Sequence, residues 1–380
     1  MISSQRHLFD IPEDVAYFNC AYMSPMLRSA VEAGTRGMAR KLRPWEITSD
    51  KFFSGADEFR ATAGKLMGAP ADRVAIIPSA SYGIAAAARN VPVQPGQSIL
   101  VLEEQFPSNY YSWHGVAEER GAKLKVVNWP ADDDWTSAVL AALTADVAVA
   151  ALPNVHWTSG GLLDLVRIGA ACREIGAALV LDLTQSLGAL PFDAAAVQPD
   201  FAIAASYKWL LGPYTTGLLY VAPKWHGSGV PVEQNWIVRS NARDFSSLTL
   251  YTGGFDAGAR RFDMGERSNF ALLPAAMHAM EQLLQWGIGE VSETAGAMNR
   301  RLAGEAAEIG FSSPRECLRA PHYLCLRRKA GIPAGLPELL AAQKVFVSVR
   351  GSSVRVTPHV YNSDRDLERL MACLRQIVMR

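Results

Sequence analysis

The chain has 380 residues, 49% of them hydrophobic and 19% charged, which provides apolar material for a large core and argues against disorder. Lys and Arg together number 37, as do Asp and Glu, so no basic excess points to nucleic acid as a partner. The apolar runs are shorter than the roughly 20 residues that a membrane span needs, so we expect no membrane association.

The N-terminal stretch and the cysteines indicate a cytoplasmic protein. Residues 1–20 lack the apolar core of a signal peptide. The five cysteines are scattered, odd in number and without C-x-x-C spacing. We therefore expect a reducing compartment, with neither a disulfide framework nor a metal site.

Seven strand-like runs lie between residues 73 and 222. Most are almost continuously apolar, which is typical of strands buried on both faces. Most segments between them have helical patterning, so we predict a mostly parallel α/β sheet with helices on both faces. In chain order the runs are RVAIIP, SILVL, LKVVN, DVAVAAL, AALVLD, DFAIAAS and GLLYVA.

The last connection between these runs differs from the others. Residues 207–215 contain a Gly-Pro turn and leave no room for a crossover helix. The run GLLYVA is therefore predicted to be antiparallel to DFAIAAS.

The pattern changes after about residue 250. Two helix-like segments precede the strand-like HYLCLRR, KVFVSV and SVRVTP, and a final helix-like segment follows. We predict a large α/β domain over residues 25–250 and a smaller α+β domain formed by residues 1–24 and 251–380. Residues 225–265, rich in Gly, Asp, Ser and aromatic residues, are expected to be irregular.

Chemically distinctive residues follow the predicted strands, at the edge where parallel sheets bind ligands. Ser79, Ala80 and Ser81 precede a helix, whose free N–H groups suit a phosphate. The other strands are followed by Phe106, by His156 and Trp157, by Asp182 and Gln185, and by Tyr207 and Lys208.

Each of these residues also has a purely structural explanation. The Ser79 stretch suits a helix cap, Phe106 a core position and His156 a buried hydrogen-bonded side chain. Asp182 suits a turn, and the Lys208 amine can extend to solvent. Taken together on one rim, they favour a functional site by roughly 10:1.

The combination fits pyridoxal phosphate (PLP). An amine in apolar surroundings forms a Schiff base with an aldehyde, which makes Lys208 the candidate. A carboxylate such as Asp182 keeps the ring nitrogen protonated, and the helix N-terminus anchors the phosphate.

On these residues the sequence resembles the class V aminotransferase family of PLP enzymes, which includes cysteine desulfurases, kynureninases and isopenicillin N epimerase. The similarity extends from YFNCAYMSP (17–25) to VRVTPHVYN (354–362). Its most specific parts are LVLDLTQSLGALPFD and, later in the chain, SYKWLLGP. The resemblance implies the PLP-dependent transferase fold type I and a homodimer with a shared active site.

The resemblance also implies roles for the cofactor-binding residues. Lys208 matches the Schiff-base lysine, Asp182 the partner of the ring nitrogen, and Gln185 the residue that bonds the ring's phenolic oxygen. Further expected cofactor contacts are the phosphate loop residues Ala80 and Ser81, the stacking residue Phe106, and Trp157, Ser206 and Tyr207.

Substrate binding is implied for a second group of residues. Arg355 matches the arginine that holds the substrate's α-carboxylate, which a guanidinium does through two parallel hydrogen bonds. Asn19 through Ala21 match a stretch near the substrate. Glu266 stands where the family has a threonine that reaches the partner subunit's phosphate, so a backbone N–H or Ser268 is the expected substitute.

Departures from the family pattern limit the reactions that we expect this protein to catalyse. Desulfurases need a nucleophilic cysteine on a mobile loop before the carboxylate-binding arginine, whereas KVFVSVRGSSVRVTP connects two strands directly and has no cysteine. We therefore do not expect desulfurase activity. Trp157 replaces an asparagine that is common near the cofactor.

We predict a PLP-dependent enzyme that acts on an amino acid, most simply an aminotransferase with a keto acid as second substrate. Epimerisation of the isopenicillin N epimerase kind, or a C–S or β-eliminating lyase, is the alternative. A racemase needs a second acid or base, for which Tyr22, Tyr207 and His156 are candidates. A non-catalytic module is least favoured, because Lys208, Asp182 and Arg355 are all present. A nicotinamide-dependent oxidoreductase is set aside, because the first predicted strand is not followed by a G-x-G-x-x-G motif.

Overall fold

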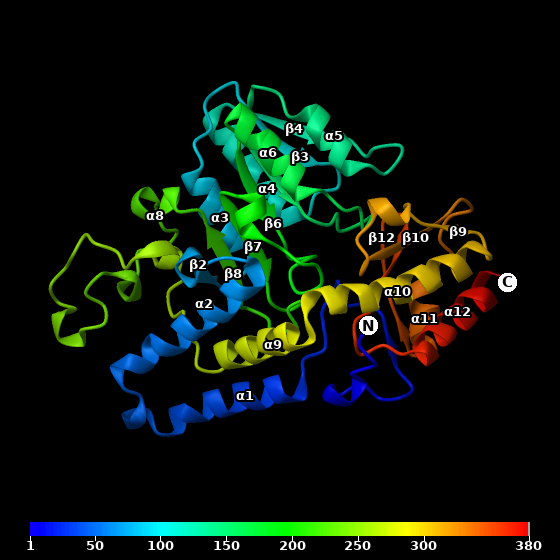
Figure 1. The fold of residues 1–380 in the computed structure, drawn as a ribbon, viewed down its shortest axis with the longest axis horizontal. Coiled ribbons are helices and arrows are strands. Elements are labelled where there is room, and N and C mark those ends of the chain that lie inside the picture. The colour runs from blue at the N-terminus through cyan, green and yellow to red at the C-terminus, as the bar shows by residue number, and fades with distance from the viewer. Residues whose placement is uncertain (379–380) are drawn as a thin grey trace.

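A seven-stranded sheet lies at the centre of the computed structural model, which describes residues 1–378 (Figure 1). Its strand order is β2-β8-β7-β6-β5-β3-β4. β8 is antiparallel to both of its neighbours, and the other neighbouring strands are parallel, so the predicted sheet is confirmed. The strands are β2 (Val74–Ile77), β3 (Ser98–Leu102), β4 (Lys123–Val127), β5 (Val147–Pro153), β6 (Ala178–Asp182), β7 (Phe201–Ala205) and β8 (Gly217–Val221).

Helices cover both faces of this sheet, because successive strand residues point to opposite sides. Val74 and Ile76 of β2 belong to one buried cluster, whereas Ala75 and Ile77 belong to the other. The first face is covered by α2 (Ser54–Met67), α5 (Trp135–Ala142), α6 (Leu165–Ile175), α7 (Ala194–Val197) and α9 (Leu272–Trp286). The second face is covered by α3 (Ala80–Asn90) and α4 (Pro107–Arg120).

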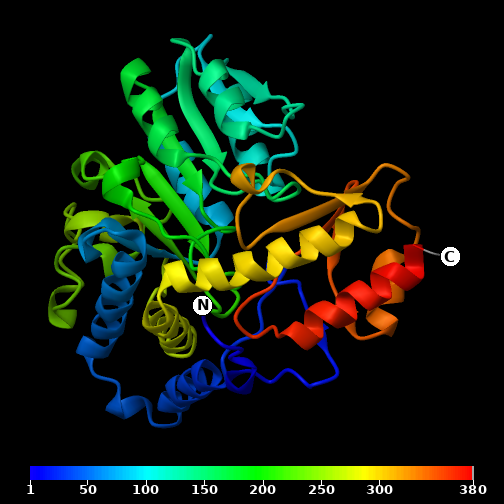
Figure 2. The same cartoon turned by 45° about the vertical axis from the view of Figure 1, so that its right-hand side comes forward.

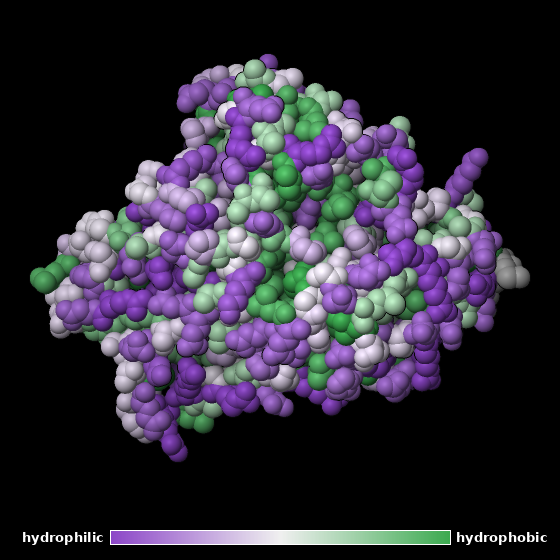
Figure 3. Space-filling view, in the orientation of Figure 1, coloured by the Kyte–Doolittle hydropathy of each residue, from purple (hydrophilic) through white to green (hydrophobic). Residues whose placement is uncertain are grey.

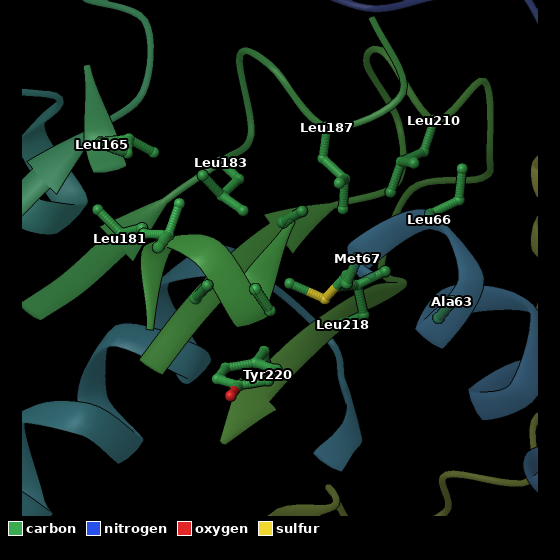
Figure 4. Close-up of a cluster of buried hydrophobic side chains, with 14 of the residues drawn as sticks. Ala63, Leu66, Met67, Leu165, Leu181, Leu183, Leu187, Leu210, Leu218 and Tyr220 are labelled. Atoms are coloured by element: carbon green, nitrogen blue, oxygen red, sulfur yellow. The ribbon is translucent and has the colours of Figure 1, made fainter. Parts of the chain in front are cut away.

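The packing of α2 on the sheet shows how the first cluster is built. Leu66 and Met67 of α2 lie beside Leu218 of β8 in Figure 4. The same helix also contacts α9, which in turn packs along α1 (Arg28–Ala39). Burying such apolar side chains contributes roughly 1.5–3 kcal/mol each, so this layer holds the sheet strands that position the site.

A second, smaller sheet lies beside the first (Figure 2). Its order is β12-β13-β10-β9, and all of its neighbouring strands are antiparallel. Near the chain start, β1 (Ala16–Tyr17) pairs with β11 (Val345–Phe346). The remaining elements are β9 (Phe311–Ser312), β10 (Leu324–Arg328), β12 (Ser348–Arg350), β13 (Ser353–Val356), α8 (Lys224–Ser228), α10 (Ile288–Ala307), α11 (Leu336–Ala342) and α12 (Asp364–Val378).

The smaller α+β unit is confirmed, whereas the boundary at residue 250 stays a prediction. Residues 225–265 contain only α8 and short 3₁₀ turns, at 236–238, 245–247 and 258–262. No helix within residues 1–378 is long and apolar enough to cross a lipid bilayer. In the space-filling view, apolar side chains gather in the middle of the face, between the large sheet and the smaller unit (Figure 3).

Candidate active site

Two adjoining pockets lie where the strands of the large sheet end. We call them the inner pocket, about 30 Å³, and the outer pocket, about 350 Å³. Phe106, Trp157, Tyr207 and Lys208 line both. The inner pocket is completed by Ala80, Gln105, Pro153, Val155, Asp182, Thr184 and Gln185. The outer pocket is completed by Ala21, Tyr22, Met23, Tyr214, Arg350 and Arg355.

Lys208 follows β7 and stands between the two pockets, with 6% of its surface exposed. Its Nζ lies 5.3 Å from the centre of the Phe106 ring and 5.5 Å from that of Tyr207. Burial lowers the pKa of the amine from 10.5 to about 8, while the Asp182 carboxylate raises it and the Arg355 guanidinium lowers it further. The amine is therefore partly neutral near physiological pH.

Asp182 is the last residue of β6, and its carboxylate is almost fully buried at the inner pocket. Its Oδ1 accepts a hydrogen bond of 3.0 Å from the Thr184 N–H. Next to it, the Gln185 Nε2 donates to the Ala21 carbonyl at 3.1 Å, and its Oε1 accepts from the Trp209 indole at 3.0 Å. These bonds hold the Gln185 amide in one orientation at the pocket wall.

The N-terminus of α3 ends at the inner pocket, through Ala80. Ser79 caps this helix: its Oγ accepts from the Tyr82 N–H at 3.2 Å and lies 2.9 Å from the Ser81 Oγ. The first N–H groups of a helix have no partner within it, and they carry its partial positive charge. This end of α3 therefore suits an anion, although the exposed Ser81 side chain lines neither pocket.

Two aromatic rings form a corner shared by the pockets. The Phe106 and Trp157 rings are perpendicular, with centroids 5.4 Å apart. The Trp157 indole donates to the Glu104 carbonyl, and its own carbonyl accepts from the Tyr323 hydroxyl at 2.7 Å. The corner is thus fixed from both the large and the small sheet.

Arg355 of β13 is 2% exposed and reaches the outer pocket from the small sheet. Its Nε donates to the Ser348 Oγ at 2.8 Å, and its Nη1 donates to the Tyr323 hydroxyl at 3.1 Å and to the Trp157 carbonyl at 3.2 Å. All of these acceptors are neutral, so the guanidinium keeps its positive charge for a ligand.

The N-terminal stretch closes the outer pocket at Ala21, whose N–H donates to the Thr357 Oγ1 at 3.2 Å. Asn19 forms a backbone bridge with Thr357, and its buried Oδ1 has no hydrogen-bond partner among the described residues. Ala21 thus lies at the predicted place, while a substrate contact of Asn19 stays a prediction.

Several predicted residues lie outside both pockets. The Ser206 hydroxyl donates to the Thr216 carbonyl inside the β7–β8 hairpin. His156 is buried, stacked on Trp135 with ring centroids 4.5 Å apart, so it does not face the site. The Ser268 hydroxyl donates to the Phe52 carbonyl, and the Gly265 N–H donates to Glu233 at 2.5 Å. Contacts of these groups with a cofactor stay predictions.

Other pocket residues were not identified from the sequence. Gln105 and Thr184 line the inner pocket, and Arg350, Tyr214 and Met23 line the outer one. Gln105 immediately precedes the predicted Phe106, and Thr184 lies between two predicted residues, so adjacency was an available signal. For Arg350 the signal was its position five residues before Arg355, across a two-residue turn.

No cysteine lines either pocket within the described part of the chain. Cys20 is buried near Lys208, and burial raises the pKa of its thiol. Cys325 lies behind the site, and burial raises its pKa to about 12. Burial thus disfavours, for both thiols, the thiolate form that a sulfur-transferring nucleophile needs.

The inner pocket fits PLP chemically, since it combines a partly neutral amine, a buried carboxylate and a helix N-terminus. It also contains a buried acceptor without a partner among residues 1–378, the Gln105 Oε1. A molecule of the size of PLP needs volume from the outer pocket as well, and the four shared residues join the two.

Comparisons with known proteins agree with this geometry. A family model described as aminotransferase class-V matches residues 31–370. The chain is 24% identical over 327 residues to the uncharacterized aminotransferase YcbU of Bacillus subtilis, covering 85% of this chain and 83% of that protein. It is also 24% identical over 329 residues to isopenicillin N epimerase of Amycolatopsis lactamdurans, covering 82% of each.

Relatives named kynureninase and probable cysteine desulfurase are also similar to this chain. Among solved structures, a cysteine desulfurase from Thermococcus onnurineus superposes with a TM-score of 0.85 at 18% identity, covering all of both chains. At 18% identity this similarity establishes the fold alone. The reaction has to be argued from the residues of the site.

Proposed function

We propose, on the premise that this chain belongs to the aminotransferase class-V family of PLP-dependent enzymes, that it transfers the amino group of an amino acid to a keto acid. One observation carries the proposal. Asp182 at the end of β6, Lys208 after β7 and Arg355 of β13 in the small sheet line two adjoining pockets. A lysine, a carboxylate and a free guanidinium are the groups that PLP chemistry on an amino acid requires.

The residues of the inner pocket account for cofactor binding. The N–H groups of Ala80 and Ser81 would hold the phosphate, and the Asp182 carboxylate would keep the ring nitrogen protonated. Gln185 would bond the phenolic oxygen, and the Phe106 and Tyr207 rings would pack against the cofactor. Bound PLP supplies a ring that withdraws electrons from the substrate's α carbon.

Lys208 and Arg355 account for the action on the substrate. Arg355 holds the α-carboxylate, which fixes the α carbon relative to the lysine. With PLP bound, Lys208, whose amine is made less basic by burial, would be placed to take the proton from that carbon and to release it again as the amino group is transferred. The aromatic corner at Trp157 keeps water from the reacting atoms.

Epimerisation or β-elimination is the second candidate, and Tyr22 favours it. Tyr22 lines the outer pocket with Lys208, and its side chain is partly accessible to solvent. A hydroxyl group on a residue that lines the same pocket as the lysine suits a second acid. Tyr207 also lines the pocket but contacts Tyr214, and burial raises the pKa of its hydroxyl to about 12.

A spectroscopic titration separates the two candidates. Purified protein with PLP is titrated with a panel of L-amino acids while the visible absorbance of lysine-linked PLP is followed. Conversion to the aminated cofactor, reversed by a keto acid, is expected for the aminotransferase. Loss of optical purity or of the β-substituent, without aminated cofactor, would instead establish the alternative.

Lys208→Ala serves as the control for this titration. Without its amine, the protein has no covalent bond to PLP that borohydride can trap. Trapping that persists in Lys208→Ala would reject the role of this lysine.

We also propose that the protein forms a homodimer with a shared active site and that it is located in the cytoplasm. The exposed Tyr22 and Met23 lie beside the outer pocket and also line a neighbouring surface hollow of about 330 Å³, a place that a second subunit suits. Sedimentation of the PLP-loaded protein as a monomer at micromolar concentration would contradict the homodimer.

A further inference from the structure

The outer pocket contains two guanidinium groups, although one α-carboxylate engages only one of them. Arg350 ends β12, and Arg355 lies in the neighbouring strand β13. In the antiparallel register Arg350 is opposite Ser353, and Ser348 is opposite Arg355. Both arginines therefore project from the same face of the sheet as diagonal neighbours, whose side chains typically begin about 7–8 Å apart.

Neither arginine has a carboxylate partner within residues 1–378. The hydrogen bonds of Arg355 go to two hydroxyls and a carbonyl, and Arg350 donates from Nη1 to the Val349 carbonyl at 2.8 Å. By contrast, the fully buried Arg60 and Arg267 both pair with the buried Asp263. Arg355 is nearly as buried as those two arginines but has no counter-charge among the described residues, and the partly buried Arg350 beside it has none either, so both guanidinium groups can pair with an anionic ligand.

The charged residues that line the outer pocket are all cationic: Lys208, Arg350 and Arg355. Both guanidinium groups lower the pKa of the Lys208 amine, so the positive charges of all three side chains influence one another within this pocket. Arg350 in turn has its pKa lowered, first by burial and then by Arg355. Two like charges brought together without a counter-ion repel each other, and an anionic ligand relieves that repulsion.

We propose that Arg350 binds a second carboxylate, so that the amino acid substrate has an acidic side chain. Arg355 holds the α-carboxylate and Arg350 the side-chain carboxylate, with the amino group directed to Lys208. The inference rests on the proposed function for the amino group, but the pairing of two carboxylates with two arginines can be measured without any reaction.

Calorimetry of the PLP-loaded protein tests the pairing directly. Glutarate, a dicarboxylate, is titrated against butyrate, a monocarboxylate of similar shape. We expect glutarate to bind at least tenfold more tightly, since a charged hydrogen-bonded pair contributes about 1.5–3 kcal/mol. Equal affinity for the two acids would overturn the inference even if amino-group transfer is confirmed.

Variants then assign the effect to Arg350. In the spectroscopic titration, the wild type is expected to prefer L-glutamate or L-aspartate over the matching amides by tenfold or more. Arg350→Gln should bring that ratio close to one, and Arg350→Lys should restore part of it. Arg328→Gln, which removes a charge from the same sheet outside both pockets, is the matched control and should keep the preference.

The outcomes separate the inference from the proposed function. If Arg350→Gln weakens the binding of the acidic amino acids and of their amides equally, the residue has a structural role and the inference fails. If no amino acid changes the cofactor spectrum, the proposed function fails, while the glutarate measurement still decides whether the pocket pairs two carboxylates.

Discussion

At the scale of single residues, the pKa of Lys208 results from opposing effects. Burial beside two aromatic rings lowers it, and the Asp182 carboxylate partly offsets this lowering. The effect of desolvation is larger than that of the Asp182 carboxylate, because the pKa of Lys208 lies below the ordinary value for lysine. A reactive amine near neutral pH is thus produced by the position of the residue after β7.

This position predicts how PLP capture by the apoprotein depends on pH. Only the neutral amine reacts, so the rate should rise about tenfold per pH unit and level off above about pH 8. Stopped-flow absorbance after mixing apoprotein with PLP measures the rate. In Arg355→Met the midpoint should move upward, because a charge that lowers the pKa is removed; a midpoint near 10.5 in the wild type would contradict this account.

Replacing Asp182 by asparagine is predicted to reduce turnover without reducing the stability of the fold. In Asp182→Asn the amide oxygen can still accept from the Thr184 N–H, but the charge proposed to keep the ring nitrogen protonated is gone. We expect kcat to fall by roughly 100-fold or more, as when other preorganised electrostatic groups are removed. The thermal unfolding midpoint should stay close to that of the wild type, and a parallel drop in both would indicate a structural role.

The residues that sequence reasoning located follow a simple physical rule. Asp182 is the last residue of one buried parallel strand, β6, and Lys208 lies three residues after the end of the next, β7; the carboxyl ends of such strands lie at the same edge of the sheet. Arg350 was not identified because its spacing from Arg355 places it in the pocket only once the register of the short antiparallel hairpin is known. The contact of Ser206 with the cofactor, which the resemblance implies, stays a prediction; its hydroxyl donates to the Thr216 carbonyl within the hairpin.

At the scale of elements, strands that are buried on both faces were readable as apolar runs, and the short Gly-Pro connection revealed the antiparallel β8. The helices α1 and α2 were not predicted. Each begins without a side-chain cap and contains glycines, which lower helix propensity. A Cβ at Gly37 would lie 1.8 Å from the Phe270 carbonyl oxygen, so this glycine serves helix packing that the sequence does not display.

The buried network around Asp263 predicts a large effect on stability. Asp263 pairs with Arg60 and Arg267, and its Oδ1 accepts from the Ile76 N–H at 2.8 Å. Asp263→Asn leaves the buried Arg267 without a counter-charge and Arg60 with only the partly exposed Asp57, so the free energy of unfolding should fall by about 3–5 kcal/mol.

Urea denaturation of the apoprotein measures this difference. Glu293→Gln is the control, because it removes an ion pair with Arg300 that lies in solvent and should cost less than about 1 kcal/mol. Equal effects of the two substitutions would show that burial does not govern the contribution of these pairs.

At the scale of the whole molecule, the N-terminal stretch ties the two parts together. Ala16 and Phe18 are buried in the core of the smaller unit, and Ala21 closes the outer pocket. The smaller unit and its sheet were predicted from the sequence, whereas the position of a second subunit depends on surfaces that apolar patterning does not reveal.

Deleting residues 1–20 is therefore predicted to damage both stability and the site. The core of the smaller unit loses Phe18, a side chain of the size whose removal typically costs about 3–5 kcal/mol. We expect a lower unfolding temperature and weaker binding of amino acids, measured by calorimetry. Glu290→Gln, which removes only an exposed ion pair with the N-terminus, should change both values little.

The position of β2 at the edge of the large sheet has a consequence for synthesis of the chain. On one side β2 pairs with β8, and on the other its Ile76 bonds with residues 263 and 264. Both neighbours are made long after β2 leaves the ribosome, and until then β2 is an apolar strand with open hydrogen-bonding edges. A chain stalled before residue 217 lacks both partners of β2, the strand that precedes α3, and we expect it to need a chaperone to avoid aggregation.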